Sequence, residues 1–336
     1  MDFLLSSVGQ YLWQTILHSF LIALVVEVII RSSSIQEPLL QIKFRSLSLW
    51  LPVLYLPFLF FTYPPRADTY FHQQVALFDS NQWLSVRLGG GIVLWHLVAV
   101  MVAVTVGFFL VRELIPLISY SFSRRPALPI LEKGRFPKLD AVLADLASKR
   151  GIPEPEVLLS GEMEPSVYTL GRRALVLSMS AIELLDAEEL EAVIAHELAH
   201  FAREILIIGR IDLALRFLMF YNPVVLLVYH RINHDTEKFC DDLAISFTGK
   251  RLALVSGLLK ILRHTTVAGA AISLPARRRW WRSLTVYSFG SQAHLALAKE
   301  RAERILHRER VSADSYQSQR LAITAGLLMA LLFFVV

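Results

Sequence analysis

The chain has 336 residues, of which 54% are hydrophobic and 19% are charged. A soluble globular protein carries about 25% charged residues, so the apolar excess here is larger than one ordinary core can hold. The composition excludes a disordered chain and a collagen-like repeat, and the single cysteine, Cys240, excludes an intrachain disulfide. We therefore expect a membrane protein.

The apolar residues are concentrated in four segments that predict membrane-spanning helices: residues 11–30, 47–63, 88–111 and 321–336. Pro52 and Pro57 are expected to kink the second helix. The third segment has 24 uncharged residues and is the strongest candidate. The fourth has 16 residues, which is short for a hydrocarbon core of about 30 Å.

Charges in the connecting loops predict the orientation. Lys and Arg exceed Asp and Glu after the first and third segments, whereas the loop after the second is balanced. The positive-inside rule then places the amino terminus outside and the region after the third span in the cytoplasm, at the plasma (inner) membrane. We predict a three-helix membrane region in 1–118, a cytoplasmic domain in 119–320 and a last span in 321–336.

The predicted cytoplasmic domain mixes helix and strand patterns. Residues 137–149 predict an amphipathic helix, and short strands are expected at 156–160, 166–170 and 174–178, the last two joined by a hairpin at 171–173. Asp186 and Glu189 resemble a capping box that opens a long helix. The expected fold is mainly α, with about four transmembrane helices and an α+β domain.

Residues 205–229 are very apolar but contain charges. Asp212 and Arg216 are expected to pair at i,i+4 on a buried or membrane-grazing helix, and Pro223 breaks the segment. A fifth span is the less favoured alternative, because uncompensated charges are costly in lipid. Glu27 is likewise expected to pair with Arg31 at the end of the first span.

The sequence His196-Glu197-Leu198-Ala199-His200 lies in a stretch with strong helical patterning. Residues four apart on a helix are neighbours, so two imidazoles at this spacing can each give one nitrogen to the same zinc ion. Glu197 then lies beside the metal without ligating it, where it can take a proton from an acidified water. The pattern predicts a zinc hydrolase, although three fixed residues in a run of five also arise by chance.

A third ligand is expected from Glu237, because a His₂Glu set leaves the fourth position of a zinc ion open for water. Asp241, one helical turn later, is expected to hydrogen-bond a ligand histidine and fix its tautomer. The alternative is an ordinary solvated helix face. The histidine motif upstream favours the ligand assignment. Donors for the oxyanion stay open among His230, His234, His264, His294 and Tyr287.

These motifs together resemble the BlaR/MecR family of membrane metallopeptidases, the beta-lactam-sensing signal transducers. The resemblance covers essentially the whole chain and is most specific at residues 166–243. The matching residues are Tyr168–Gly171, Leu185–Leu190, His196–His200, Arg203, Asn222-Pro223 and Glu237–Asp242. It implies a gluzincin-type domain with catalytic Zn²⁺ that cleaves a cytoplasmic protein, typically a transcriptional repressor. Those sensors continue past the fourth span into an extracellular antibiotic-binding domain, whereas the sequence here stops at Val336. We therefore expect this chain to lack that sensor domain.

Three other interpretations stay open. The HtpX and CAAX prenyl protease group shares the His-Glu-x-x-His and Glu-x-x-x-Asp elements, and Glu300-Arg301 with Glu303-Arg304-Ile305 is similar to its downstream segment. That group would imply protein quality control or processing. A zinc-fold signalling scaffold without turnover, or a channel with a chance motif, belongs to another functional class. Glu197 argues against the scaffold.

The net charge of +5 is expected to mark a membrane surface rather than a nucleic-acid interface. Residues 277–310 contain nine Lys or Arg and three Glu, beside Trp280 and Trp281. A basic stretch with tryptophans is typical of a segment that lies on a bilayer. The expected partners are therefore the lipid bilayer and a cytoplasmic protein substrate, without direct nucleic-acid binding.

Overall fold

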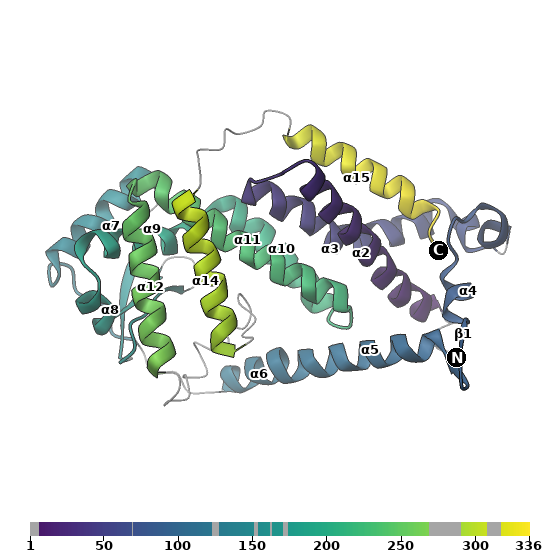
Figure 1. Ribbon diagram of the computed structural model, residues 1–336, viewed down its shortest axis with the longest axis horizontal. Helices are drawn as coiled ribbons and strands as arrows, with labels where there is room; N and C mark the ends of the chain where they lie inside the picture. The colour runs from purple at the N-terminus through teal and green to yellow at the C-terminus, as the bar shows by residue number, and fades with distance from the viewer. Residues whose placement is uncertain are drawn as a thin grey trace. The chain divides into compact units, whose positions relative to one another are not determined.

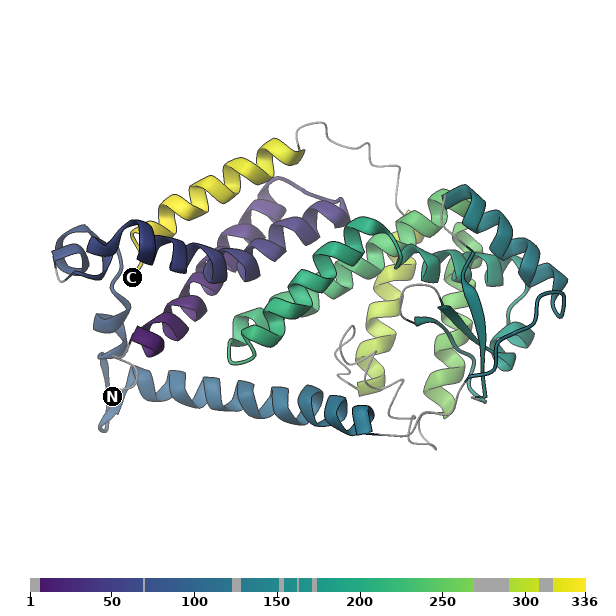
Figure 2. The same cartoon turned by 180° about the vertical axis from the view of Figure 1, so that it is seen from behind.

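The computed structural model describes residues 7–68, 70–122, 128–150, 154–161, 163–170, 174–268, 290–307 and 317–336. The chain forms two compact units. The first comprises Met1–Pro116, Ile208–Asp235 and Ser312–Val336, and the second comprises Leu117–Ile207 and Thr236–Val311. Figure 1 shows their helices and strands coloured along the chain, and Figure 2 shows them from behind.

Helices dominate the first unit. Its elements up to residue 114 are α2 (Ser7–Ser32), α3 (Pro38–Thr62), η1 (Pro64–Ala67), η2 (Phe71–Val75), α4 (Ser80–Leu84), β1 (Arg87–Gly89), β2 (Ile92–Val93), α5 (Leu94–Phe109) and η3 (Leu110–Leu114). Later parts of the chain contribute most of α10 (Arg203–Leu218), the first half of α11 (Pro223–Thr248) and α15 (Gln317–Phe333).

Three helices in the described part of the chain are long and apolar enough to cross a membrane: Gly9–Ser32, Pro38–Thr62 and Leu94–Ser119. They support the predicted membrane protein. The apolar helix at Gln319–Phe333 is shorter, so the fourth span stays a prediction. The core of this unit is formed where α2, α3 and α15 meet, through Ile22, Phe44 and Leu332 among others.

Several local predictions for the first unit are wrong. The third helix begins at Leu94 rather than residue 88, because Gly89, Gly90 and Gly91 adopt positive φ angles in the turn between β1 and β2. The second begins earlier, at Pro38. Helix α3 contains Pro52 and Pro57, and the kink expected at them stays a prediction.

Two predicted i,i+4 ion pairs are also replaced by partners from other helices. Glu27 pairs with Arg45 at 2.8 Å and with Arg231 at 2.9 Å, instead of with Arg31. On α10, Asp212 accepts hydrogen bonds from Ser46 and Trp50 of α3, while Arg216 pairs with Glu113 of η3. Tertiary contacts therefore decide the pairing in each case.

A small sheet begins the second unit. It contains β3 (Glu156–Ser160), β4 (Val167–Leu170) and β5 (Ala174–Ser178) in the order β3-β5-β4. Strand β5 is parallel to β3 and antiparallel to β4, so that Val176 lies between Leu158 and Tyr168. All three predicted strands are confirmed, although β4 begins one residue later than expected. The predicted turn at 171–173 lies outside the described residues.

The helices of this unit are α6 (Ile115–Phe122), α7 (Pro137–Arg150), α8 (Met179–Leu184), α9 (Ala187–Ala199), α12 (Arg251–Ala268) and α14 (Gly290–His307), with the second half of α11. Helix α9 is the centre of the core, and Ile194 and Leu198 are fully buried there. Helix α12 approaches it closely at Gly257, where a Cβ atom would lie 2.8 Å from Val193 Cγ2. The predicted helix at 137–149 is confirmed as α7.

Candidate metal centre

Helix α9 begins with a reciprocal cap. Asp186 accepts hydrogen bonds from the backbone N–H groups of Glu188 and Glu189 at 3.0 and 2.9 Å, and the Asp186 N–H donates to Glu189 Oε2 at 3.0 Å. The predicted capping box is thus confirmed. Because the cap and the apolar face fix the helix, the side chains at 196 and 200 come from a rigid element.

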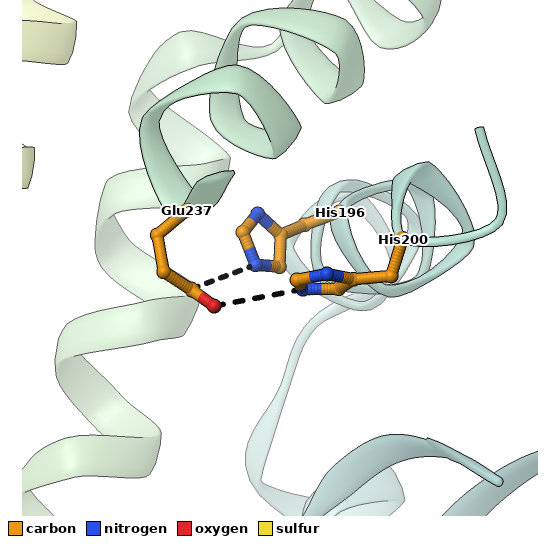
Figure 3. A group of neighbouring side chains, drawn as sticks. All are labelled: His196, His200 and Glu237. Carbon is orange, nitrogen blue, oxygen red and sulfur yellow. Dashed lines mark ion pairs between the residues drawn. The ribbon is translucent and has the colours of Figure 1, made fainter. Parts of the chain in front are cut away.

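The two histidines of the motif lie next to each other at the end of α9. Their ring centroids are 5.2 Å apart and the ring planes are nearly perpendicular, at 86°. His196 is buried and His200 is half-buried. Figure 3 shows both rings directed toward the same carboxylate, that of Glu237 on α11.

Glu237 completes a three-residue cluster. His196 Nε2 lies 3.4 Å from Glu237 Oε2, and His200 Nε2 lies 3.7 Å from Glu237 Oε1. One ligand atom from each residue fits within 4.8 Å of the other two. The structure therefore brings together the three side chains that the sequence proposed as metal ligands.

The Nδ1 atom of each histidine lies close to a second residue of α11 rather than to Glu237. His196 Nδ1 lies 2.9 Å from Asp241 Oδ1, and His200 Nδ1 lies 3.5 Å from the sulfur of Cys240. A partner at Nδ1 orients an imidazole and leaves Nε2 for a metal. Asp241 is fully buried, which fits the orienting role expected for it.

Arg301 on α14 is a part of this centre that the sequence did not assign. Its guanidinium donates to Asp241 through Nε at 2.9 Å and Nη2 at 2.7 Å, and its Nη1 lies 2.9 Å from Glu237 Oε2. The sequence places Arg301 in a segment similar to one of the HtpX and CAAX prenyl protease group, but does not identify its partner. Only the packing of α14 reveals which carboxylates it meets.

Charge and burial shift the pKa values of the two histidines in opposite directions. Burial lowers the pKa of His196, but the contacts with Asp241 and Glu237 outweigh it and raise that pKa to about 9. Burial lowers the pKa of His200 to about 4, more than the Glu237 charge can offset. Burial opposes ionisation of Asp241 as well, yet Arg301 and His196 hold its pKa at about 2.

The donors fit a zinc ion. Ligand atoms about 2.0–2.1 Å from a tetrahedral zinc are separated by roughly 3.3 Å, close to the measured distances between the imidazole nitrogens and Glu237. Two imidazoles and one carboxylate also form the usual set of a catalytic zinc, which keeps a fourth position open. The chemistry and the spacing of the cluster therefore agree.

Glu197 and Cys240 have distinct environments. Glu197 is half-buried on α9, between the two histidines in sequence. Cys240 is fully buried, and burial with the charges of Glu237, Asp241 and Glu197 raises its pKa well above the ordinary value. A thiol in that state is a poor nucleophile, so Cys240 packs as an unreactive residue of α11.

The oxyanion candidates lie in different parts of the chain. His264 is exposed on α12, whereas His230 and His234 belong to the first compact unit. Tyr287 lies outside the described residues, and so do Trp280 and Trp281 with Arg277–Arg282. The described part of the basic stretch is α14, where Arg301 and Arg304 pair with Asp241 and Asp242.

Comparisons with known proteins agree on a peptidase. The family model described as BlaR1 peptidase M56 matches residues 4–274. Curated relatives include a protease HtpX homolog from Thermococcus kodakarensis, 26% identical over 37% of this chain and 52% of the relative, and one from Pseudarthrobacter chlorophenolicus, 27% identical over 44% and 61%. A third, from a Sulfurihydrogenibium species, is 32% identical over 37% of this chain and 45% of the relative. The chain thus spans about half the length of these relatives.

Proposed function

Because the chain belongs to the BlaR1-type M56 peptidase family, we propose that it is a membrane-bound zinc endopeptidase whose site is the His196–His200–Glu237 cluster. The observation that carries the proposal is the convergence of two Nε2 atoms and one carboxylate, each imidazole having its other nitrogen against a buried partner. A chance motif in a channel would not require those outward partners.

In this proposal His196, His200 and Glu237 hold the metal. A bound zinc ion supplies Lewis-acid chemistry, lowering the pKa of water to about 7 and polarising the scissile carbonyl. Glu197 takes a proton from the attacking water as the new C–O bond forms. It then gives that proton to the amine nitrogen as the C–N bond breaks, which balances the hydrolysis.

Asp241 and Arg301 act as positioning residues. Asp241 fixes His196 through Nδ1, and Arg301 holds both Asp241 and Glu237 in place. The charges of the centre alternate: Arg301 lies between the buried carboxylate of Asp241 and the half-buried carboxylate of Glu237, and both carboxylates contact histidines. The positive charge of Arg301 favours the ionised form of both carboxylates.

Two physiological roles compete. The relatives carry the name protease HtpX homolog, which favours processing or quality control of proteins. Cleavage of a cytoplasmic repressor in signal transduction is the second candidate, and membership of the BlaR1-type family favours it. For both roles we propose that residues 119–320, apart from Ile208–Asp235 of the first compact unit, lie on the cytoplasmic side of the inner membrane. The amino terminus would lie outside, and residues 321–336 would form a fourth span.

Comparing cleaved peptides in cells that carry the wild type or Glu197→Gln tests the proposal. Glu191→Gln is the matched control, because Glu191 lies on the same helix and pairs with Lys250 at 2.8 Å. We expect only the first change to abolish a set of cleavages. Accumulating uncleaved membrane proteins would support processing, and one uncleaved DNA-binding protein would support signalling. Identical cleavage in all three strains would refute the peptidase.

A further inference from the structure

The segment from Ile208 to Asp235 buries charged side chains and exposes apolar ones. Figures 1 and 2 show α10 and α11 lying side by side and joined by a short turn. Between Ile211 and Tyr229 the two charged residues, Asp212 and Arg216, are buried. The exposed positions there are apolar instead, with Leu218 60% and Leu227 66% exposed. A water-facing hairpin has the opposite arrangement.

The buried polar groups of the hairpin find their partners on the candidate membrane helices. Asp212 accepts hydrogen bonds from Ser46 Oγ at 2.7 Å and Trp50 Nε1 at 2.6 Å, both on α3. Arg216 pairs with Glu113, within the candidate span Leu94–Ser119. Each charge is therefore neutralised or hydrogen-bonded, which is the condition for placing it at membrane depth.

The depth of these contacts increases toward the turn. Arg231 and Asp235, at the open end of the hairpin, contact the ion pair of Glu27 with Arg45. At the turn, Asn222 Nδ2 donates to Ser19 Oγ at 3.1 Å, close to the middle of the candidate span Gly9–Ser32.

The hairpin also contacts α2 one turn further on. The hydroxyl of Tyr221 lies 2.8 Å from that of Thr15. Thr15 precedes Glu27 by 12 residues, which is about 18 Å along a helix. The open end of the hairpin thus contacts the first span near Glu27, and the turn of the hairpin contacts the same span further along, at Ser19 and Thr15.

The length of the hairpin agrees with that depth. From Arg210 to Leu218, and from Pro223 to Arg231, each leg has eight residue steps, or about 12 Å of helix. With the turn added, this reaches about halfway into a hydrocarbon core of about 30 Å. Both legs have an exposed arginine at the shallow end, where long cationic side chains meet lipid headgroups.

We propose that Ile208–Asp235 is a re-entrant hairpin that enters the bilayer to about its middle and presents Leu218 and Leu227 to lipid acyl chains. The candidate spans of the same unit expose apolar side chains in the same way; Val104 on α5, for example, is 66% exposed. This assignment differs from both sequence expectations, a fifth span and a grazing helix. It is independent of the zinc chemistry, so its failure would leave the peptidase proposal standing.

Nitroxide labels in proteoliposomes test the proposal. Cysteines are introduced one at a time at Leu218 and Leu227, with Val104→Cys as the lipid control and Met163→Cys, at a residue 92% exposed, as the water control. Cys240 is fully buried, so the unsubstituted chain treated identically gives the background. The vesicles contain phosphatidylethanolamine and phosphatidylglycerol, and collisions with oxygen and with a water-soluble nickel chelate are compared.

We expect labels at Leu218 and Leu227 to lose nickel access to the level of the Val104 control while keeping high oxygen access. A label at Arg210 is expected to fall between the two controls. Nickel access equal to that at Met163 would overturn the proposal, and so would low access to both reagents, because a second copy of the chain would then cover the surface. Ile211 and Phe220, exposed on the same hairpin, replace any variant that elutes as an aggregate.

Discussion

Replacing Asp241 by Asn should weaken zinc binding without removing any metal ligand. The carboxylate lies 2.9 Å from His196 Nδ1 and accepts from Arg301 Nε at 2.9 Å and Nη2 at 2.7 Å. An amide is neutral and has one acceptor oxygen, so it cannot serve all three donors. His196 then becomes a less basic and less firmly oriented ligand.

Loss of such an orienting partner lowers metal affinity about 10–100-fold, or about 1.4–2.7 kcal/mol. Asp242→Asn is the matched control, because Asp242 is the next residue on α11 and pairs with Arg304 at 2.7 Å. Its ion pair is partly exposed, so we expect a stability change of about 1 kcal/mol or less and unchanged zinc affinity.

The assay is competition for zinc between the purified, detergent-solubilised protein and a chromophoric chelator. The expected order of affinity is wild type equal to Asp242→Asn, with Asp241→Asn weaker by at least about tenfold. Equal affinities in the two variants would refute the orienting role of Asp241. A loss only in Asp242→Asn would refute the geometry of the centre itself.

Two further predictions concern stability. Arg301→Gln should lower the unfolding free energy of the metal-free protein by about 3–5 kcal/mol, because it leaves the buried carboxylate of Asp241 uncompensated. Added zinc should restore part of that free energy, and Arg304→Gln should show neither effect in calorimetry. Glu189→Gln should destabilise the protein by about 1.5–3 kcal/mol at pH 7, since Glu189 is buried and pairs with Lys260 at 2.7 Å. Burial opposes ionisation of Glu189, but the hydrogen bond from Lys260 outweighs burial and lowers the pKa of Glu189. The stability that Glu189 contributes is therefore present above its unfolded pKa and is lost as pH falls through its folded pKa. A difference that persists unchanged at pH 3 would contradict that assignment.

Local patterns explain what could be predicted from the sequence. The cap at Asp186 and the histidines at 196 and 200 depend only on helix periodicity, and short strands follow from runs such as Glu156–Ser160. Glu237 required one assumption more, because it lies 37 residues after His200 and on another helix. The structure brings it to the histidines as expected.

Contacts between distant segments explain what could not be predicted. Arg301 meets Asp241 across 60 residues, and Asp212 meets Ser46 across 166. For Asp212 the neighbouring Arg216 was the natural partner by spacing, yet Glu113 takes that arginine. Spacing rules apply to exposed helix faces, whereas a buried charge takes whichever partner the packing provides.

The central claim is that one zinc ion and Glu197 together hydrolyse peptides at this cluster. The most direct test measures zinc content and peptide hydrolysis on the same purified samples of the wild type and Glu197→Gln. We predict one zinc per chain in both proteins and hydrolysis only in the wild type, abolished by a chelator. Full hydrolysis by Glu197→Gln, or a wild type that hydrolyses peptides without bound zinc, would contradict the account.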